Sequence, residues 1–216
     1  MIPTPITFAR YWHRNLNPKK LVECEFSFKP ADQAMSRFVK LHRLPDEPCL
    51  PGIKQMEPAD VPAVTAALNA HLFANYKVHI SFTEDEVAHF MLPQHDVVYS
   101  YVIKDYTTGK VTDFTSFYSL PSHVLNHPEH KRINAAYGFY SFVSSGDAAR
   151  FNALMKDALI FARKEKFDVF NVTEVMMHRH GLEKNMFKMG DGNLAHYLYN
   201  WRINTVKAED VGIILV

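Results

Sequence analysis

The sequence has little cysteine, little glycine and almost no excess of either charge. Its 216 residues include 2 cysteines and 8 glycines, and 24 Lys+Arg residues are balanced by 23 Asp+Glu. Without a basic excess the chain cannot displace many counterions from a phosphate backbone, so we expect no nucleic-acid partner. Two cysteines in such a chain, Cys24 and Cys49, predict free thiols rather than a disulfide framework, and hence a cytoplasmic protein.

Long hydrophobic runs are also absent. The longest ones, near residues 97–103 and 213–216, are far shorter than the roughly 18 residues that a membrane helix needs, so we expect no transmembrane segment. The first residues, Met-Ile-Pro-Thr-Pro, lack the basic and apolar regions of a signal peptide. A composition that is 47% hydrophobic and 22% charged is typical of a globular protein with a substantial core.

Prolines interrupt the chain at Pro45, Pro48 and Pro51, and this cluster predicts a boundary because proline removes a backbone donor. We therefore expect an entry segment, residues 1–50, that packs on a main domain, residues 51–216. Within the entry segment, apolar and polar residues alternate over 22–28, which predicts a half-buried strand.

Local signals in the main domain predict alternating strands and helices. Thr83 and Glu86 form a capping box for a short helix to Phe90, and Asp147 is suited to cap a longer helix. A turn at residues 108–109 joins two apolar runs into a hairpin. Hydrophobic spacing predicts further strands at 53–56, 137–143, 169–172, 197–202 and 212–216, and helices at 58–73 and 174–184. This order resembles an acetyltransferase-like (GNAT) α+β fold, a mixed sheet flanked by helices.

Several short strings carry a more specific resemblance, and they occur in one order over nearly the whole chain. They are Tyr11-Trp12-His13-Arg14 followed by residues 16–21, Phe117-Tyr118-Ser119-Leu120-Pro121-Ser122, Asn126-His127-Pro128, Phe167-Asp168-Val169-Phe170-Asn171, Gly190-Asp191-Gly192-Asn193-Leu194 and Tyr197-Leu198-Tyr199-Asn200-Trp201. Together they resemble the C-terminal half of glycylpeptide N-tetradecanoyltransferases, the N-myristoyltransferases. One string departs from the family pattern Lys-Phe-Gly-x-Gly-Asp-Gly, because Lys188 stands where the first glycine is expected.

The resemblance also implies what this half lacks. In the family, the N-terminal half binds the acyl-CoA and supplies the oxyanion-hole amides, and the present sequence has no counterpart of it. The junction at residues 143–149 agrees, because it has one glycine, no preceding cation and an acid at Asp147, whereas a CoA pyrophosphate favours a glycine-rich helix start. We expect no cofactor bound by this half, with tetradecanoyl-CoA as co-substrate of the complete enzyme.

The resemblance assigns roles to particular residues. The terminal α-carboxylate of Val216 is implied as the general base toward the substrate's N-terminal glycine, which requires partial desolvation because its ordinary pKa is near 3.5. The implied peptide-binding residues are polar or aromatic, except for a glycine that follows one of them. They are Tyr11, His13, Tyr118, Ser122, Tyr137, Asn171, Asp191 and Gly192. Histidines at 123, 127, 130, 178 and 180 lack accompanying cysteines, so we expect no metal site.

Three functions stay open at this point. The first is the peptide-binding half of an N-myristoyltransferase, which acts on N-terminal glycine peptides and is inactive without an acyl-CoA-binding half. The second is a non-catalytic peptide-binding module that self-associates as a homodimer through the face that the other half covers. The third is a self-sufficient N-acyltransferase.

Overall fold

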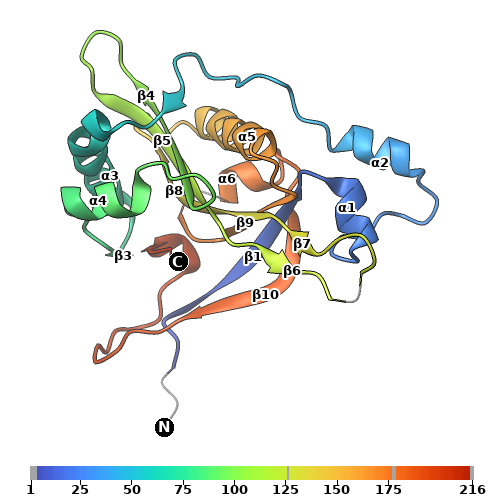
Figure 1. Ribbon diagram of the computed structural model, residues 1–216. Coiled ribbons are helices and arrows are strands. Elements are labelled where there is room, and N and C mark those ends of the chain that lie inside the picture. The colour runs from blue at the N-terminus through green and yellow to red at the C-terminus, as the bar shows by residue number, and fades with distance from the viewer. Residues whose placement is uncertain (1–3, 126, 177–178, 215–216) are drawn as a thin grey trace.

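The computed structural model describes residues 4–125, 127–176 and 179–214. A mixed sheet runs through its centre, with helices on both faces (Figure 1). The elements in chain order are β1 (Thr7–Asn15), α1 (Pro18–Glu23), α2 (Met35–Leu41), β2 (Lys54–Gln55), η1 (Pro58–Asp60), α3 (Val61–Asn75), β3 (Val78–His79), α4 (Glu84–Met91), β4 (Val98–Lys104), β5 (Val111–Ser119), β6 (Ser122–His123), β7 (Arg132–Ile133), β8 (Ala135–Val143), α5 (Ala148–Lys164), β9 (Val169–Thr173), α6 (Arg179–Leu182), β10 (Lys188–His196), η3 (Ala208–Asp210) and β11 (Val211–Gly212).

The main sheet has the strand order β10-β1-β9-β8-β5-β4-β2. Its neighbours are antiparallel except β8 and β9, which are parallel and are connected through α5. Two small sheets lie outside it: β11 pairs with β3 in parallel, and β6 pairs with β7. β1 is therefore an internal strand of the main sheet, although it belongs to the predicted entry segment, and the division at residue 50 stays a prediction.

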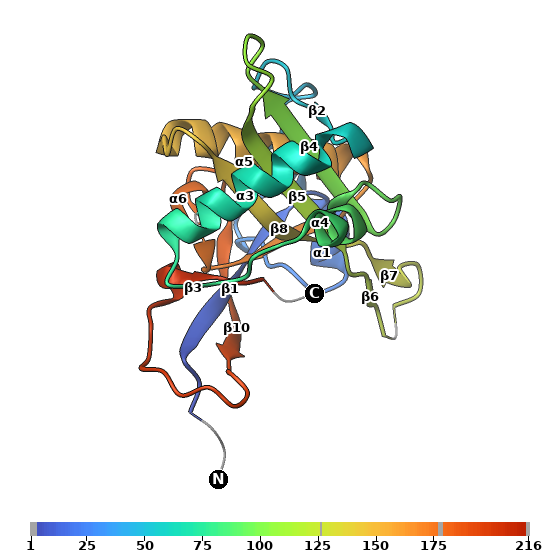
Figure 2. The same cartoon turned by 90° about the vertical axis from the view of Figure 1, so that its left-hand side faces the viewer.

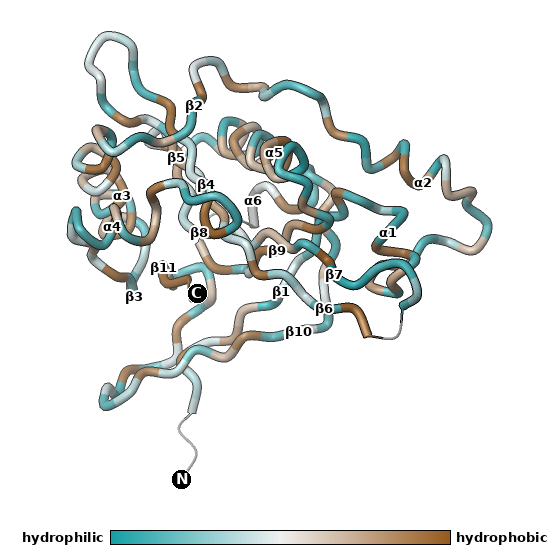
Figure 3. Tube along the Cα trace, viewed as in Figure 1, coloured by the Kyte–Doolittle hydropathy of each residue, from teal (hydrophilic) through white to brown (hydrophobic). Residues whose placement is uncertain are grey.

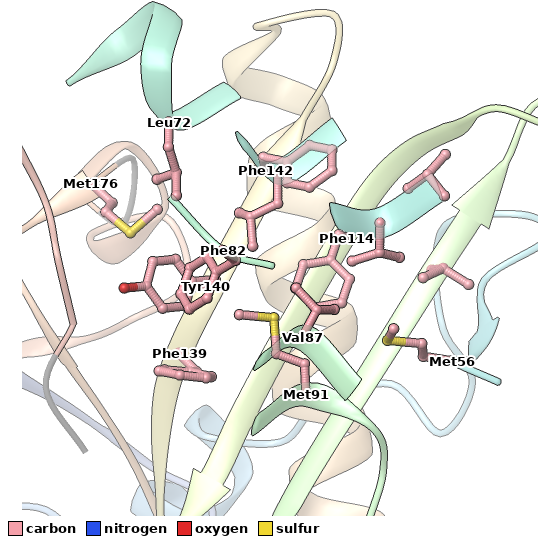
Figure 4. Packing of buried hydrophobic residues seen from close by; sticks show 14 of the residues in the cluster. Met56, Leu72, Phe82, Val87, Met91, Phe114, Phe139, Tyr140, Phe142 and Met176 are labelled. Carbon is pink, nitrogen blue, oxygen red and sulfur yellow. The ribbon is translucent and has the colours of Figure 1, made fainter. Parts of the chain in front are cut away.

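Two hydrophobic clusters lie on opposite faces of the sheet. In one, α3 and α4 pack on β5 and β8 through residues such as Leu72, Val87 and Phe142 (Figure 4), and Figure 2 shows α3 crossing that face. In the other, α5 packs on the opposite face through residues such as Leu159, against Phe117. The edge strand β10 is mostly hydrophilic (Figure 3), which suits a strand with one unpaired side.

Most local signals are confirmed. The Thr83 hydroxyl accepts a hydrogen bond from the Glu86 amide while the Glu86 carboxylate accepts one from the Thr83 amide, so the capping box starts α4. The Asp147 carboxylate accepts from the Ala149 amide at 2.9 Å and starts α5. The hairpin of β4 and β5, the helix α3 and the strands β2, β8 and β9 also lie where the spacing predicts them.

The strand predicted over 22–28 is wrong. The Asn17 side chain accepts from the Lys20 amide and Pro18 occupies the first helical turn, so residues 18–23 form α1. Of the apolar members of the alternation, Val22, Cys24, Phe26 and Phe28, the two phenylalanines are 39% and 78% exposed, so the pattern does not mark a buried face.

The C-terminal quarter also differs from its prediction. The strand expected at 197–202 is wrong, because the sheet strand is β10 at 188–196 and Asn200 has a φ of +60°. The helix expected from 174 is shorter, since α6 spans Arg179–Leu182 and Met176 has a φ of +62°. The strand expected at 212–216 is reduced to β11 at Val211–Gly212; residues 215–216 lie outside the described residues.

Candidate functional site

The candidate site is built around a bulge between β1 and β10. Arg10 pairs with Asn193 and Trp12 pairs with Met189, so the segment 190–192 bulges opposite Tyr11. A Cβ atom on Gly190 would lie 2.3 Å from Nε2 of His13, and one on Gly192 would lie 3.3 Å from Cδ2 of Tyr11. Glycine at these positions therefore lets the β10 backbone approach the Tyr11 and His13 side chains closely.

His13 and Asn171 are brought together by the pairing of β1 with β9. Their Cα atoms are direct partners across the antiparallel strands, and His13 Nδ1 lies 2.7 Å from Asn171 Oδ1. An amide oxygen only accepts, so Nδ1 carries a proton and donates this bond. Asn171 is 2% exposed and is thus held firmly, whereas His13 is half-buried.

Three tyrosines from three strands meet beside this pair. Tyr137 on β8 stacks on Tyr118 of β5 with ring centroids 5.5 Å apart and contacts Tyr11 edge-on at 6.4 Å. Burial is the main cause that raises the pKa of Tyr118 to about 12, with the neighbouring Tyr11 and Tyr137 adding to it. Burial likewise raises the pKa of Tyr11. Both phenols therefore stay protonated at neutral pH and keep their hydroxyl donors.

These side chains line a small cavity, which we call the tyrosine cavity. Its lining consists of Tyr11, Tyr118, Tyr137, Gly138, Asn171, Val172, Thr173, Leu194, His196, Ile213 and Ile214. The C-terminal segment reaches it after β11, and the Ile214 amide donates a hydrogen bond to the Tyr140 hydroxyl at 3.2 Å. The chain thus brings its last described residues into contact with the same cavity that holds Tyr11 and Asn171.

Several predicted site residues lie apart from the tyrosine cavity. Asp191 is exposed and lines an adjoining cleft together with His13 and Lys188. Ser122 is exposed on β6, outside the main sheet, and does not line the cavity. Val216 lies outside the described residues.

Sequence reasoning missed three contributors to the site. Gly190 is required by its approach to His13, and Leu194 and His196 line the cavity from the end of β10. His196 is 6% exposed, and burial lowers the pKa of its ring. The alternation of Leu194 and His196 would have indicated one strand face, but only a correct assignment of β10 makes that signal readable.

The histidines do not gather into a ligand set in the part of the chain that the structure describes, where no cluster of three metal-binding side chains occurs. His127 and His130 stack on each other with centroids 4.8 Å apart, and His130 Nε2 lies 3.0 Å from a Glu23 carboxylate oxygen. Cys24 and Cys49 are free thiols. Of the described helices, none combines the length and the apolar character needed to cross a membrane.

Fold and site together define an acetyltransferase-like α+β domain with an aromatic, polar cavity at a strand bulge. Comparison with known proteins identifies it further: residues 23–213 match the family model "Myristoyl-CoA:protein N-myristoyltransferase, C-terminal domain". The chain belongs to the N-myristoyltransferase family. The predicted family resemblance and the fold class are thereby confirmed.

Curated relatives agree over the entire chain. Glycylpeptide N-tetradecanoyltransferase 1 of Arabidopsis thaliana is 45% identical, and the Bos taurus enzyme 2 is 44% identical; each alignment covers 100% of this chain but 49% and 42% of the relative. A crystal structure of Saccharomyces cerevisiae N-myristoyltransferase with bound myristoyl-CoA superposes with a TM-score of 0.93 at 27% identity, covering 100% of this chain and 58% of that chain. The chain spans about half the length of the curated relatives it matches.

Proposed function

We propose that this chain is the peptide-binding half of an N-myristoyltransferase, which transfers a tetradecanoyl group from CoA to the N-terminal glycine of a peptide. The observation that carries this proposal is the meeting of the C-terminal segment with the tyrosine cavity, where Ile213 and Ile214 lie beside Tyr11 and Asn171. We propose that the terminal carboxylate of Val216, two residues beyond Ile214, serves a ligand bound there, because two residues span at most about 7 Å.

The side chains of the cavity and of the adjoining cleft suit an extended peptide. Protonated tyrosine hydroxyls and the His13–Asn171 pair supply donors and acceptors, and the tyrosine rings supply apolar walls. Asp191 and Gly192 lie in the bulge next to His13 and Tyr11 and would contact the peptide as it leaves the cavity. Ser122 would contact it from β6.

The proposed reaction is the attack of the glycine amine on the thioester of tetradecanoyl-CoA. The glycine ammonium transfers one proton to the Val216 carboxylate, and the resulting neutral amine attacks the thioester carbonyl of tetradecanoyl-CoA. The new C–N bond forms, the C–S bond breaks, and the CoA thiolate leaves and takes up the second amine proton. Direct amine attack needs no nucleophilic side chain, and none of the described residues that line the cavity is a serine or a cysteine.

The start of α5 supports the view that another half supplies the acyl-CoA site. Asp147 occupies the helix N-terminus with its carboxylate, and the amides of Gly146 and Asp147 already donate to Val143 O and the Ser145 hydroxyl. A pyrophosphate at this position would meet a carboxylate instead of free amides. We therefore propose no cofactor for this half alone, and an acyl-CoA-binding half as its partner.

The test is an acylation assay with a glycine-terminated peptide and tetradecanoyl-CoA, performed on this chain with and without the N-terminal half of a relative. We expect turnover only with both halves. In the reconstituted enzyme, amidating the Val216 carboxylate should lower kcat roughly 10²–10⁴-fold, the range for a positioned acid–base group, whereas Val216→Leu should retain most activity. Full turnover by the amidated chain would refute the terminal base.

A second candidate function, a self-associating peptide-binding module, is favoured by exposed aromatic residues after β10. Tyr197, Tyr199 and Trp201 are 49%, 88% and 76% exposed, and apolar surface of this kind favours partners. Light scattering distinguishes a homodimer from a monomer, and peptide binding without turnover in the two-half assay would favour this module.

Titration with tetradecanoyl-CoA tests the third candidate, a self-sufficient N-acyltransferase. Tight binding to the monomer would support it and contradict our proposal. The free thiols of Cys24 and Cys49 support the proposed cytoplasmic location.

A further inference from the structure

A cationic pocket lies on the face of β1 opposite His13. Successive side chains of a strand point to opposite faces, so Arg14 is directed away from the candidate site. Arg14 lines a pocket of about 470 Å³ to which distant segments contribute. The lining consists of Arg14, Arg43, Leu44, Pro45, Lys156, Lys184, Asn185 and Met186. Four of these eight residues are cationic, and none of them is acidic.

Arg14 is a buried cation without a carboxylate partner. It is 2% exposed, and its two terminal nitrogens donate to the backbone carbonyls of Asn15 at 2.6 Å and His42 at 3.1 Å. Its Nε–H is buried and has no hydrogen-bond partner among the described residues, and no described carboxylate forms an ion pair with the guanidinium. Burial lowers the pKa of Arg14 to about 10. A buried charge left without a counterion is costly, which indicates that an anion belongs next to it.

The other charges near the pocket do not neutralise it. Arg43 reaches Asp46 only at 4.0 Å, and both side chains are about three-quarters exposed, so this pair is weak. Asp157, which follows Lys156 on α5, is directed to another segment, where its carboxylate accepts from the amides of Cys49 and Leu50. The pocket thus keeps a positive potential.

We propose that this pocket binds a phosphate group, either free or carried by a small molecule. The guanidinium of Arg14, which lacks a counterion, and two lysines match the charge of a phosphate dianion, whereas a single carboxylate would neutralise less of the site. Leu44, Pro45 and Met186 provide an apolar wall for an organic part, and the volume is in the range of small-molecule sites. The site is separate from the tyrosine cavity and independent of the function proposed above.

The first test is calorimetry with inorganic phosphate, pyrophosphate and AMP at constant ionic strength. We expect saturable binding of one ligand per chain, weakened roughly tenfold in Lys156→Gln and in Lys184→Gln, since each removes one charge-assisted hydrogen bond. Lys110→Gln, at the exposed turn between β4 and β5, is the matched control and should bind as the wild type does. If AMP binds more tightly than phosphate, the natural ligand carries its phosphate on a small molecule. If the two affinities are equal, the natural ligand is the free phosphate ion. Absence of saturable binding, or equal weakening in the control, would overturn the proposal.

A second test addresses Arg14. Phosphate should raise the thermal midpoint of the wild-type chain, because a ligand that binds only the folded state stabilises it. In Arg14→Met, which keeps the length of the side chain but removes the charge, the midpoint should no longer respond to phosphate. An Arg14→Met chain that folds and still responds fully to phosphate would overturn the role of Arg14. If the variant does not fold, the Arg14 Nε–H resonance of the wild-type chain is followed instead: it should shift when phosphate is added, and an unchanged resonance would overturn the role of Arg14.

This pocket also bears on the acyl-CoA titration, because CoA carries phosphate groups. CoA binding that is weakened roughly tenfold in Lys156→Gln belongs to the cationic pocket, and CoA binding that this substitution leaves unchanged belongs elsewhere. The phosphate proposal and the proposed transferase function can therefore fail separately.

Discussion

Substituting Gly190 by alanine should damage the candidate site through a single atom. The added Cβ would lie 2.3 Å from Nε2 and 2.7 Å from Cδ2 of His13, and 3.2 Å from the Tyr11 carbonyl oxygen. The first two distances are far below van der Waals contact, so the His13 ring has to rotate away. Rotation breaks its 2.7 Å hydrogen bond with Asn171, a residue that is only 2% exposed.

The expected cost follows from these two effects. Crowding a packed site costs about 1–3 kcal/mol, and leaving a buried amide without its partner adds about 1 kcal/mol or more. We therefore expect Gly190→Ala to lower the free energy of unfolding by about 2–4 kcal/mol. In a domain of this size a loss of 2 kcal/mol lowers the thermal midpoint by roughly 4–8 °C.

The assay is urea unfolding of four chains: the wild type, Gly190→Ala, His13→Ala and the double variant. Removing the His13 ring also removes the clash. Gly190→Ala should therefore lower the free energy of unfolding much less in the His13→Ala background than in the wild type, with a coupling energy between the two substitutions of at least about 1 kcal/mol. Gly192→Ala is the matched control, because its Cβ would be 3.3 Å from Tyr11 Cδ2 and needs only a small shift. Additive effects of Gly190→Ala and His13→Ala, or a Gly190→Ala chain as stable as the wild type, would refute this account of the bulge.

Two further predictions concern stability away from the site. Burial lowers the pKa of His71 to about 4, below its ordinary value of 6.5. The stability that the neutral ring contributes is therefore present above pH 6.5 and is lost as the pH falls toward 4. The loss is roughly 1–3 kcal/mol after allowing for partial solvent exposure. Urea titrations at pH 7.5 and 5 should show this loss in the wild type and a smaller one in His71→Phe, and equal losses would contradict it. Asp157→Asn removes one of the two oxygens that accept from the Cys49 and Leu50 amides, and should lower the free energy of unfolding by about 1–3 kcal/mol without changing peptide binding; an unchanged urea midpoint would contradict that.

The sequence alone determined the elements that depend on neighbouring residues. The Thr83–Glu86 capping box and the Asp147 cap each act within three residues of the helix start, so their pattern is sufficient to predict α4 and α5. The short motifs around Tyr11 and Asp191 were likewise sufficient to indicate the family. Alternation was a poorer guide, since the segment 22–28 alternates but overlaps the end of the capped helix α1 and contains exposed phenylalanines.

Only the tertiary structure decided which of these residues meet. His13 and Asn171 are 158 positions apart, and their hydrogen bond depends on the register of β1 against β9. The bulge that places Gly190 against His13 depends in turn on the pairing of β1 with β10. The pocket of Arg14 depends on α5 and on the segments that follow α2 and α6. Strand pairing across such separations is specified by the burial of one whole face of the sheet, a property of the assembled core that no local stretch of sequence contains.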